Sequence, residues 1–288
     1  MFAHVAASLG QCRAITEEDS GTMFTIDDDV CRPDFRVVLQ DGQQFFVEVK
    51  NCHHANAAKP CRLKNDYLTG LRKYGNCMGS PVKLAIYWSR WRLWTLVDTC
   101  HLLTSEHAAG VSMLDAMKLN EMSVLGDCMI ATVPPLALRI YADQTAPCTV
   151  QPDGSTPFTI SDIVFFSANN RITDPFERKL AWFFILHSRW IEIATPAEIA
   201  GGKLKYAEFQ YGPAEEMGCD GQPFRILGFV SEMISSQYAD ATSAEQRITL
   251  LMPESDVVEY GIVIPHDYQG QVLQLWRFVV QPNVRQKE

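Results

Sequence analysis

Apolar and polar residues alternate between residues 35 and 50 in a pattern that predicts two β-strands joined by a tight turn. The arms are Phe35–Leu39 and Gln43–Lys50, and both are rich in β-branched and aromatic residues. Gln40-Asp41-Gly42 lies between them, and Asp-Gly between two such runs is typical of a hairpin. Successive side chains point to opposite faces of a strand, so the register decides which residues share a face.

The same pattern selects between two registers of this hairpin. A two-residue turn would place Asp34 opposite Val49, whereas a three-residue loop with Gly42 left-handed places Asp34 opposite Glu48. The second register gives one face that is apolar apart from Gln43, and we therefore predict it. The apolar face then holds Phe35, Val37, Leu39, Phe45, Val47 and Val49, and the other holds Asp34, Arg36, Gln44, Glu48 and Lys50, interrupted by Val38 and Phe46.

Three reactive side chains meet on the polar face in this register. Asp34 and Glu48 are carboxylates that could hold Mg²⁺ against a phosphodiester, and Lys50 could assist the attacking water. An ordinary amphipathic hairpin with a solvated polar face would show the same pattern. The residues alone leave both interpretations open.

Periodicity along the rest of the chain predicts an α/β protein with helices and strands in both halves. A helix over Cys61–Met78 carries Tyr67 and Tyr74 on its apolar stripe, where we expect them in the core or a groove wall. The other predicted helices are 3–12, 112–121, 175–190, 195–201 after a capping box, and 226–238, and the other predicted strands are 82–88, 91–97, 136–141, 248–252, 257–264 and 272–280.

A turn-rich stretch over residues 143–157 suggests a linker. We therefore predict a boundary near residue 150, with one domain over residues 1–150 and a second α+β domain over 151–288. A long loop within one domain is the alternative. The second domain carries no catalytic constellation, and substrate binding, formation of a homodimer or regulation would all suit it.

Composition is that of an ordinary soluble protein: 288 residues, of which 47% are hydrophobic and 20% charged. No apolar run approaches the ~20 residues needed to cross a bilayer, so we expect no membrane partner. Nine cysteines occur without a Cys-x-x-Cys pair, and the first residues lack the pattern of a signal peptide. We therefore expect reduced thiols and a cytoplasmic location.

Charge is distributed unevenly along the chain. The net charge is −9, yet the segment from Lys50 to Arg92 contains nine Lys or Arg residues and a single acid, Asp66. A basic groove on an acidic protein would concentrate a polyanion beside the hairpin, although each charge alone could belong to a solvated face. The predicted nucleic-acid-binding residues are Lys59, Arg62, Lys64, Arg72 and Lys73.

Pro33-Asp34 together with Glu48-Val49-Lys50 resembles the signature of the PD-(D/E)XK nuclease superfamily. The resemblance covers roughly residues 1–98 and implies a restriction-endonuclease-like mixed sheet flanked by helices. It implies that Asp34 and Glu48 bind Mg²⁺, with Mn²⁺ as an alternative, and that Lys50 orients or activates water. Many members carry a glutamate on a helix before the first strand. The helix expected here has no acid, and Glu17 and Glu18 follow it.

Three functions are compatible with these features. The leading expectation is a Mg²⁺-dependent endonuclease that hydrolyses phosphodiester bonds in nucleic acid, with DNA as the expected substrate. The missing upstream acid leaves open a nucleic-acid-binding module that has lost catalysis. A third alternative is an interaction protein that acts through its acidic C-terminal half.

Overall fold

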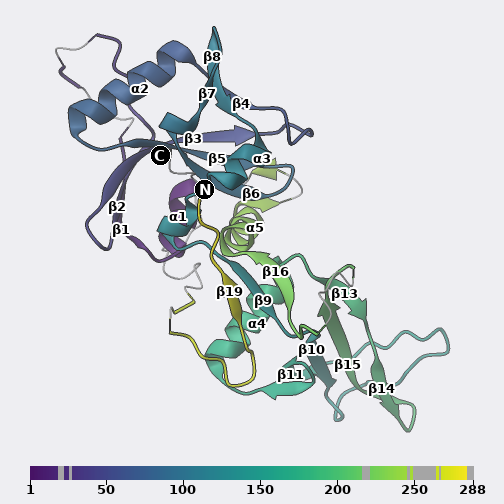
Figure 1. Cartoon of the computed structure of the whole chain (residues 1–288). Coiled ribbons are helices and arrows are strands. Elements are labelled where there is room, and N and C mark those ends of the chain that lie inside the picture. The colour runs from purple at the N-terminus through teal and green to yellow at the C-terminus, as the bar shows by residue number, and fades with distance from the viewer. Residues whose placement is uncertain are drawn as a thin grey trace. The chain divides into compact units, whose positions relative to one another are not determined.

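The computed structural model describes residues 1–18, 23–25, 28–215, 221–244, 247–248, 264–265 and 267–283. The chain packs as two compact units (Figure 1). The first unit contains Met1–Cys128 and, from the later part of the chain, Phe229–Val263 and Phe278–Glu288. The second contains Met129–Gly228 and Ile264–Arg277. The predicted boundary near residue 150 therefore differs from the packing, which divides the chain after Cys128 and returns residues 229 onward to the first unit.

The first unit has a mixed α/β architecture. Its elements are α1 (Phe2–Ser8), β1 (Cys12–Glu17), β2 (Phe35–Leu39), β3 (Gln44–Cys52), β4 (Cys61–Lys64), α2 (Asn65–Met78), β5 (Val82–Trp88), β6 (Leu93–Asp98), β7 (Leu103–Thr104), β8 (Ala108–Val111), α3 (Met113–Lys118), α5 (Val230–Thr242), β17 (Ser243–Ala244) and β18 (Arg247–Ile248), with 3₁₀ turns at Thr99–His101 and Met122–Leu125.

Five strands form the main sheet in the order β1-β2-β3-β5-β6. The pairing of β3 with β5 is parallel and the others are antiparallel, because α2 connects β3 to β5 as a crossover. On one face, Leu71 and Tyr74 of α2 pack against Phe46. On the other face, Trp94 contacts Phe2 of α1 and donates a hydrogen bond to Ser235 of α5. The expected mixed sheet flanked by helices is confirmed (Figure 1).

Three predicted helices of the first unit are shorter than expected, and the one predicted at 112–121 is α3, over Met113–Lys118. Residues 61–64 form β4, in which buried and exposed side chains alternate, and α2 begins only at Asn65. β4 pairs with β8, and the β7–β8 hairpin projects from the unit (Figure 1). Helix α1 ends at Ser8 because Gly10 has a positive φ of 85°. Cys12, the expected end of this helix, is instead the first residue of β1.

The second unit is built around an antiparallel sheet. Its elements are β9 (Met129–Thr132), β10 (Leu136–Ala142), β11 (Ile160–Ser167), β12 (Asn170–Ile172), α4 (Pro175–His187), β13 (Ile191–Ala194), β14 (Ala197–Ala200), β15 (Lys203–Gly212), β16 (Arg225–Phe229) and β19 (Trp276–Phe278). The main sheet has the order β12-β11-β10-β15-β13, and β14 also pairs with β15. Residues 143–159 connect β10 to β11, which are neighbours in this sheet, so the turn-rich stretch is a long loop and not a linker.

Helix α4 was predicted correctly, and its neighbours differ from expectation. Asp174 caps α4 by accepting hydrogen bonds from the N–H groups of Phe176 and Glu177, both at 2.9 Å. The capping box at 195–198 begins no helix, because residues 197–200 form β14. Residues 225–229 form β16 before α5 begins, and residues 276–278 alone form a strand in the segment 272–280. The strand expected at 257–264 lies almost entirely outside the described residues, as does most of the one at 248–252.

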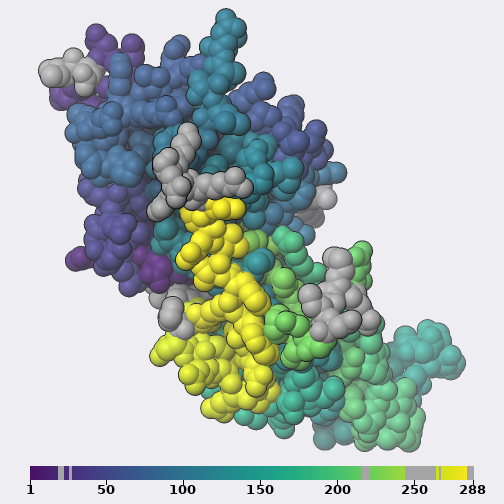
Figure 2. All heavy atoms as spheres, viewed as in Figure 1, coloured from purple at the N-terminus to yellow at the C-terminus, as the bar shows by residue number. Residues whose placement is uncertain are grey.

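A buried carboxylate ties the C-terminal segment to α4. Glu177 exposes 2% of its surface, and its carboxylate accepts hydrogen bonds from the backbone N–H groups of Gln271, Val272 and Leu273. Figure 2 shows this segment, in yellow, running over the outside of the second unit. In the described part of the chain, no helix is long and apolar enough to span a bilayer.

Candidate active site

The hairpin of β2 and β3 has the predicted register. Phe35 pairs with Val47, and this register places Asp34 opposite Glu48. The loop between the strands has three residues, with Gly42 at φ +86° and its N–H donating to the Leu39 carbonyl at 3.0 Å. This local geometry brings Asp34, Glu48 and Lys50 to the sheet face that α2 covers.

Glu48 lies at the centre of the site, buried beneath α2 with 1% of its surface exposed. Its Oε1 accepts hydrogen bonds from Lys50 Nζ and from the Tyr67 hydroxyl, the latter at 2.8 Å. Its Oε2 is buried and has no hydrogen-bond partner among the described residues. A fully solvated polar face, the alternative interpretation of the hairpin, is therefore wrong at Glu48.

Burial raises the pKa of Glu48 above the ordinary value of a glutamate, because the charged form loses its hydration. The hydrogen bond and positive charge of Lys50 oppose this rise in pKa, and the negative charge of Asp34 adds to it. The hydrogen bond from Tyr67 acts in the same direction as Lys50. A divalent cation at the free Oε2 would add further stabilisation of the carboxylate.

Asp34 lies across the hairpin from Glu48, and Lys50 follows Glu48 by two residues in β3. Asp34 Oδ2 accepts a hydrogen bond of 2.7 Å from the Val49 N–H, which fixes the carboxylate of Asp34 against β3. Lys50 Nζ lies 5.5 Å from the centre of the Tyr67 ring, and 34% of the Lys50 side chain is exposed. Lys50 is thus held by Glu48 while remaining accessible from solvent.

The two carboxylates fit a magnesium ion by their chemistry. Mg²⁺ in proteins is bound by oxygen ligands, commonly one or two carboxylates together with water and substrate phosphate. The buried, unpartnered Oε2 of Glu48 is the oxygen that a cation would satisfy. Among the described residues, no three His, Cys, Asp or Glu side chains form a metal-binding group, so the fit is to a two-carboxylate site.

Glu18 lies closer to the site than its place in the sequence suggested. Its N–H donates to the Asp34 carbonyl at 2.9 Å, which continues the pairing of β1 with β2 and places Glu18 opposite Asp34. The carboxylate is already engaged, with Oε1 at 2.9 Å from Arg36 Nε and Oε2 accepting a hydrogen bond from the Tyr74 hydroxyl. We therefore leave Glu18 out of the candidate metal ligands.

Tyr67 is the site residue that sequence reasoning missed. Its apolar spacing on α2 indicated a core or groove-wall position, and its ring does pack against the core. Its hydroxyl, however, reaches Glu48. The only sequence signal is its position on the helix that follows the hairpin, which indicates no direction for the hydroxyl.

The predicted nucleic-acid-binding residues differ in how freely they can meet a ligand. Arg62 and Lys64 are exposed on the same face of β4, and Lys59 is exposed in the preceding loop. In α2, Arg72 donates to the Thr99 carbonyl, and Lys73 donates to the Asp28 carbonyl at 2.8 Å. The first three are the most available to a phosphate backbone.

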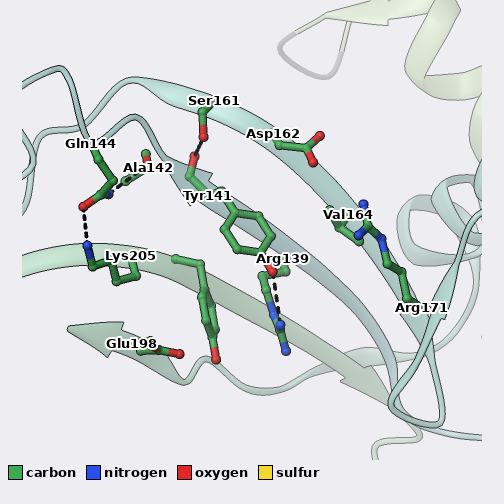
Figure 3. A pocket seen from close by; sticks show the side chains of 11 residues that line it. Arg139, Tyr141, Ala142, Gln144, Ser161, Asp162, Val164, Arg171, Glu198 and Lys205 are labelled. Carbon is green, nitrogen blue, oxygen red and sulfur yellow. Dashed lines mark hydrogen bonds between the residues drawn. The ribbon is translucent and has the colours of Figure 1, made fainter. Parts of the chain in front are cut away.

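A separate hollow of about 720 Å³ lies on the sheet of the second unit (Figure 3). Arg139 is its central cation, bound to Glu208 at 2.6 Å and to the Tyr141 hydroxyl at 3.2 Å. The guanidinium also lies 4.2 Å from the centre of the Tyr206 ring. Because these groups satisfy one another, we interpret this network as structural.

Comparisons with known sequences identify no family for this chain. No protein-family model matches the chain, and no curated protein is similar to it. Among solved structures, the chain is similar to Hjc, a Holliday junction resolvase from the archaeal hyperthermophile Archaeoglobus fulgidus. The TM-score is 0.28 and the identity 17%, over 34% of this chain and 74% of that one. A similarity of this size says nothing about activity.

Proposed function

We propose that this protein is a Mg²⁺-dependent nuclease that hydrolyses phosphodiester bonds in DNA. The observation that carries the proposal is Glu48, a carboxylate buried beneath α2. Lys50 and Tyr67 hold one of its oxygens, and the other has no partner in the part of the chain that the structure describes. Burying such a group is costly, and titratable groups in this kind of environment are concentrated at functional sites.

The three residues have two roles in the proposed reaction. Asp34 and Glu48 hold the cation, and a bound Mg²⁺ supplies Lewis acidity toward the phosphate and lowers the pKa of water. Lys50 turns from Glu48 toward the scissile group, where its ammonium orients the attacking water and balances negative charge. The 34% exposure of its side chain leaves room for that movement.

The distribution of charge supports a nucleic acid as the substrate. The segment from Lys50 to Arg92 has nine basic residues and one acid, in a protein whose net charge is −9. Arg62 and Lys64 are exposed on β4, directly before the helix that carries Tyr67. A polyanion would be attracted to this surface and repelled elsewhere.

The test is cleavage of plasmid and single-stranded DNA by the purified chain in Mg²⁺, Mn²⁺ or EDTA. We expect Asp34→Ala and Lys50→Ala each to reduce the cleavage rate by at least about 100-fold without loss of folding. Lys179→Ala, an exposed substitution on α4, is the matched control and should cleave as the wild type does. Metal-dependent cleavage that persists in both site variants would refute the proposal.

A nucleic-acid-binding module without catalysis is the second candidate. It is favoured by the absence, among the described residues, of a three-carboxylate metal group. It predicts a salt-sensitive DNA complex and no cleavage by the wild type with any divalent cation. The same assay, combined with a binding measurement, separates the two candidates.

A further inference from the structure

Two tyrosines of α2 reach down to two different carboxylates of the sheet. Tyr67 and Tyr74 are seven residues apart, which is about two helical turns and places them on one side of the helix. Tyr67 donates its hydroxyl hydrogen bond to Glu48 Oε1 at 2.8 Å, and Tyr74 donates to Glu18. The helix therefore places one tyrosine hydroxyl on the candidate metal ligand Glu48 and a second one on Glu18.

The Tyr67 hydroxyl and Lys50 share one acceptor atom. Both donate to Glu48 Oε1, which leaves Oε2 as the unpartnered oxygen. If Lys50 turns toward substrate, an Oε1 without another donor would be a buried acceptor left unsatisfied, and the carboxylate would be free to rotate. Tyr67 keeps Oε1 occupied whichever way Lys50 points.

We infer that Tyr67 is a positioning residue, whose hydroxyl holds Glu48 Oε1 so that Oε2 stays directed at a divalent cation while Lys50 is released to the substrate. The inference rests on the proposed nuclease function and concerns the geometry of its metal ligand. Tyr67 itself touches no reacting atom.

Helix α2 is held firmly enough for Tyr67 to act in this way. At its first residue, Asn65 Nδ2 donates to the Ser105 carbonyl at 2.9 Å and to the Glu106 carbonyl at 3.1 Å. The Tyr67 ring packs against buried residues on both sides, in the cluster around Leu84 and in the cluster around Phe46. A donor mounted on a packed helix fixes its acceptor better than a donor on a loop does.

The experiment compares Tyr67→Phe with Tyr74→Phe in the full chain. Both variants keep the ring and lose one hydroxyl from the same helix, and thermal unfolding confirms that each is folded. We measure Mn²⁺ binding without DNA, by the electron paramagnetic resonance signal of free Mn²⁺, and the Mg²⁺ concentration that gives half-maximal cleavage. Tyr67→Phe should weaken Mn²⁺ binding and raise that Mg²⁺ concentration by about tenfold, with cleavage restored at high Mg²⁺.

Tyr74→Phe should leave both quantities unchanged, since Tyr74 donates to Glu18. Unchanged Mn²⁺ binding in Tyr67→Phe, beside a wild type that cleaves, overturns the inference and leaves the nuclease function standing. Equal weakening in both variants also overturns it, because that result indicates general loosening of α2. A wild type that neither binds Mn²⁺ nor cleaves DNA defeats the proposed function itself.

Discussion

The burial of Glu48 lowers the stability of the fold around the candidate site. Glu48 is 1% exposed, the pKa of its carboxyl group is raised by burial, and no residue in the described ranges donates a hydrogen bond to Oε2. An ionised carboxylate loses its hydration when it is buried, and a neutral amide of the same shape loses less. Natural proteins retain such costs where function requires them.

We therefore predict that Glu48→Gln abolishes cleavage and raises the free energy of unfolding by about 1 kcal/mol near neutral pH. The pKa of Glu48 is raised in the folded state, so its charged form destabilises the fold at pH values above that pKa and the penalty is relieved as the pH falls through it. The advantage of the variant should therefore shrink in acid. Urea unfolding at several pH values measures it, and a variant less stable than the wild type at neutral pH contradicts the prediction.

At the scale of residues, the sequence could predict the register of the hairpin, because only one register separates apolar from polar positions. That register, now observed, places Asp34 opposite Glu48. It could not predict Tyr67 as a partner of Glu48, because a tyrosine on an apolar stripe fits the core equally well and its hydroxyl direction depends on tertiary packing.

At the scale of elements, Gly70 allows α2 to pack closely against the segment that contains Asp29 and Cys31. A Cβ at Gly70 would lie 2.5 Å from Cys31 Sγ and 2.6 Å from the Asp29 carbonyl oxygen. The segment that contains Cys31 leads directly into Pro33-Asp34, so the spacing between α2 and this segment helps to place Asp34. Glycine in mid-helix costs about 1 kcal/mol relative to alanine, and the contact explains why it is tolerated here.

Gly70→Ala should destabilise the protein despite its better helix propensity. We expect the free energy of unfolding to fall by roughly 1 kcal/mol or more, because the overpacked methyl must displace backbone. Cleavage should fall with it, as Asp34 is moved. Asn76→Ala, exposed on the same helix, is the control and should be neutral or stabilising; thermal unfolding and plasmid cleavage report both variants. If Gly70→Ala is as stable as the control, the segment around Cys31 moves to accommodate the methyl group without loss of stability, and the prediction is wrong.

Two of the stretches that were predicted as helix or helix start are short strands. β4 pairs with β8, and β14 pairs with β15, and neither strand is longer than four residues. A four-residue run carries too little periodicity to compete with helix-start signals such as the capping box at 195–198. Helix α4 and the β2–β3 hairpin were predicted, whereas the long strands β11 and β15 of the second unit were missed.

At the scale of the whole molecule, the chain order conceals how the units are assembled. Residues 143–157 have the composition of a linker, yet they join two neighbouring strands of one sheet. Helix α5 follows the second unit in sequence but packs in the first, where Ser231 bonds to the buried Asp127 at 2.6 Å and Trp94 donates to Ser235. Composition reflects local polarity and does not indicate which segments distant in sequence pack together.

The basic residues exposed on β4 should make DNA binding sensitive to salt. If the surface around β4 binds a phosphate backbone, DNA affinity must fall with salt, because each neutralised phosphate releases a counterion. We expect Arg62→Ala and Lys64→Ala each to weaken DNA binding and to reduce the slope of log affinity against log salt by about one. Fluorescence anisotropy with a labelled duplex in EDTA measures this binding without cleavage.

Lys179→Ala removes the same charge from an exposed position on α4 in the second unit and is the matched control. Its salt slope should equal that of the wild type, since the −17 carried outside the Lys50–Arg92 segment opposes binding elsewhere. An equal loss in all three variants would mean that only net charge matters. If no variant loses DNA affinity, the DNA binds a different surface. The surface around β4 would then not guide the substrate to Glu48.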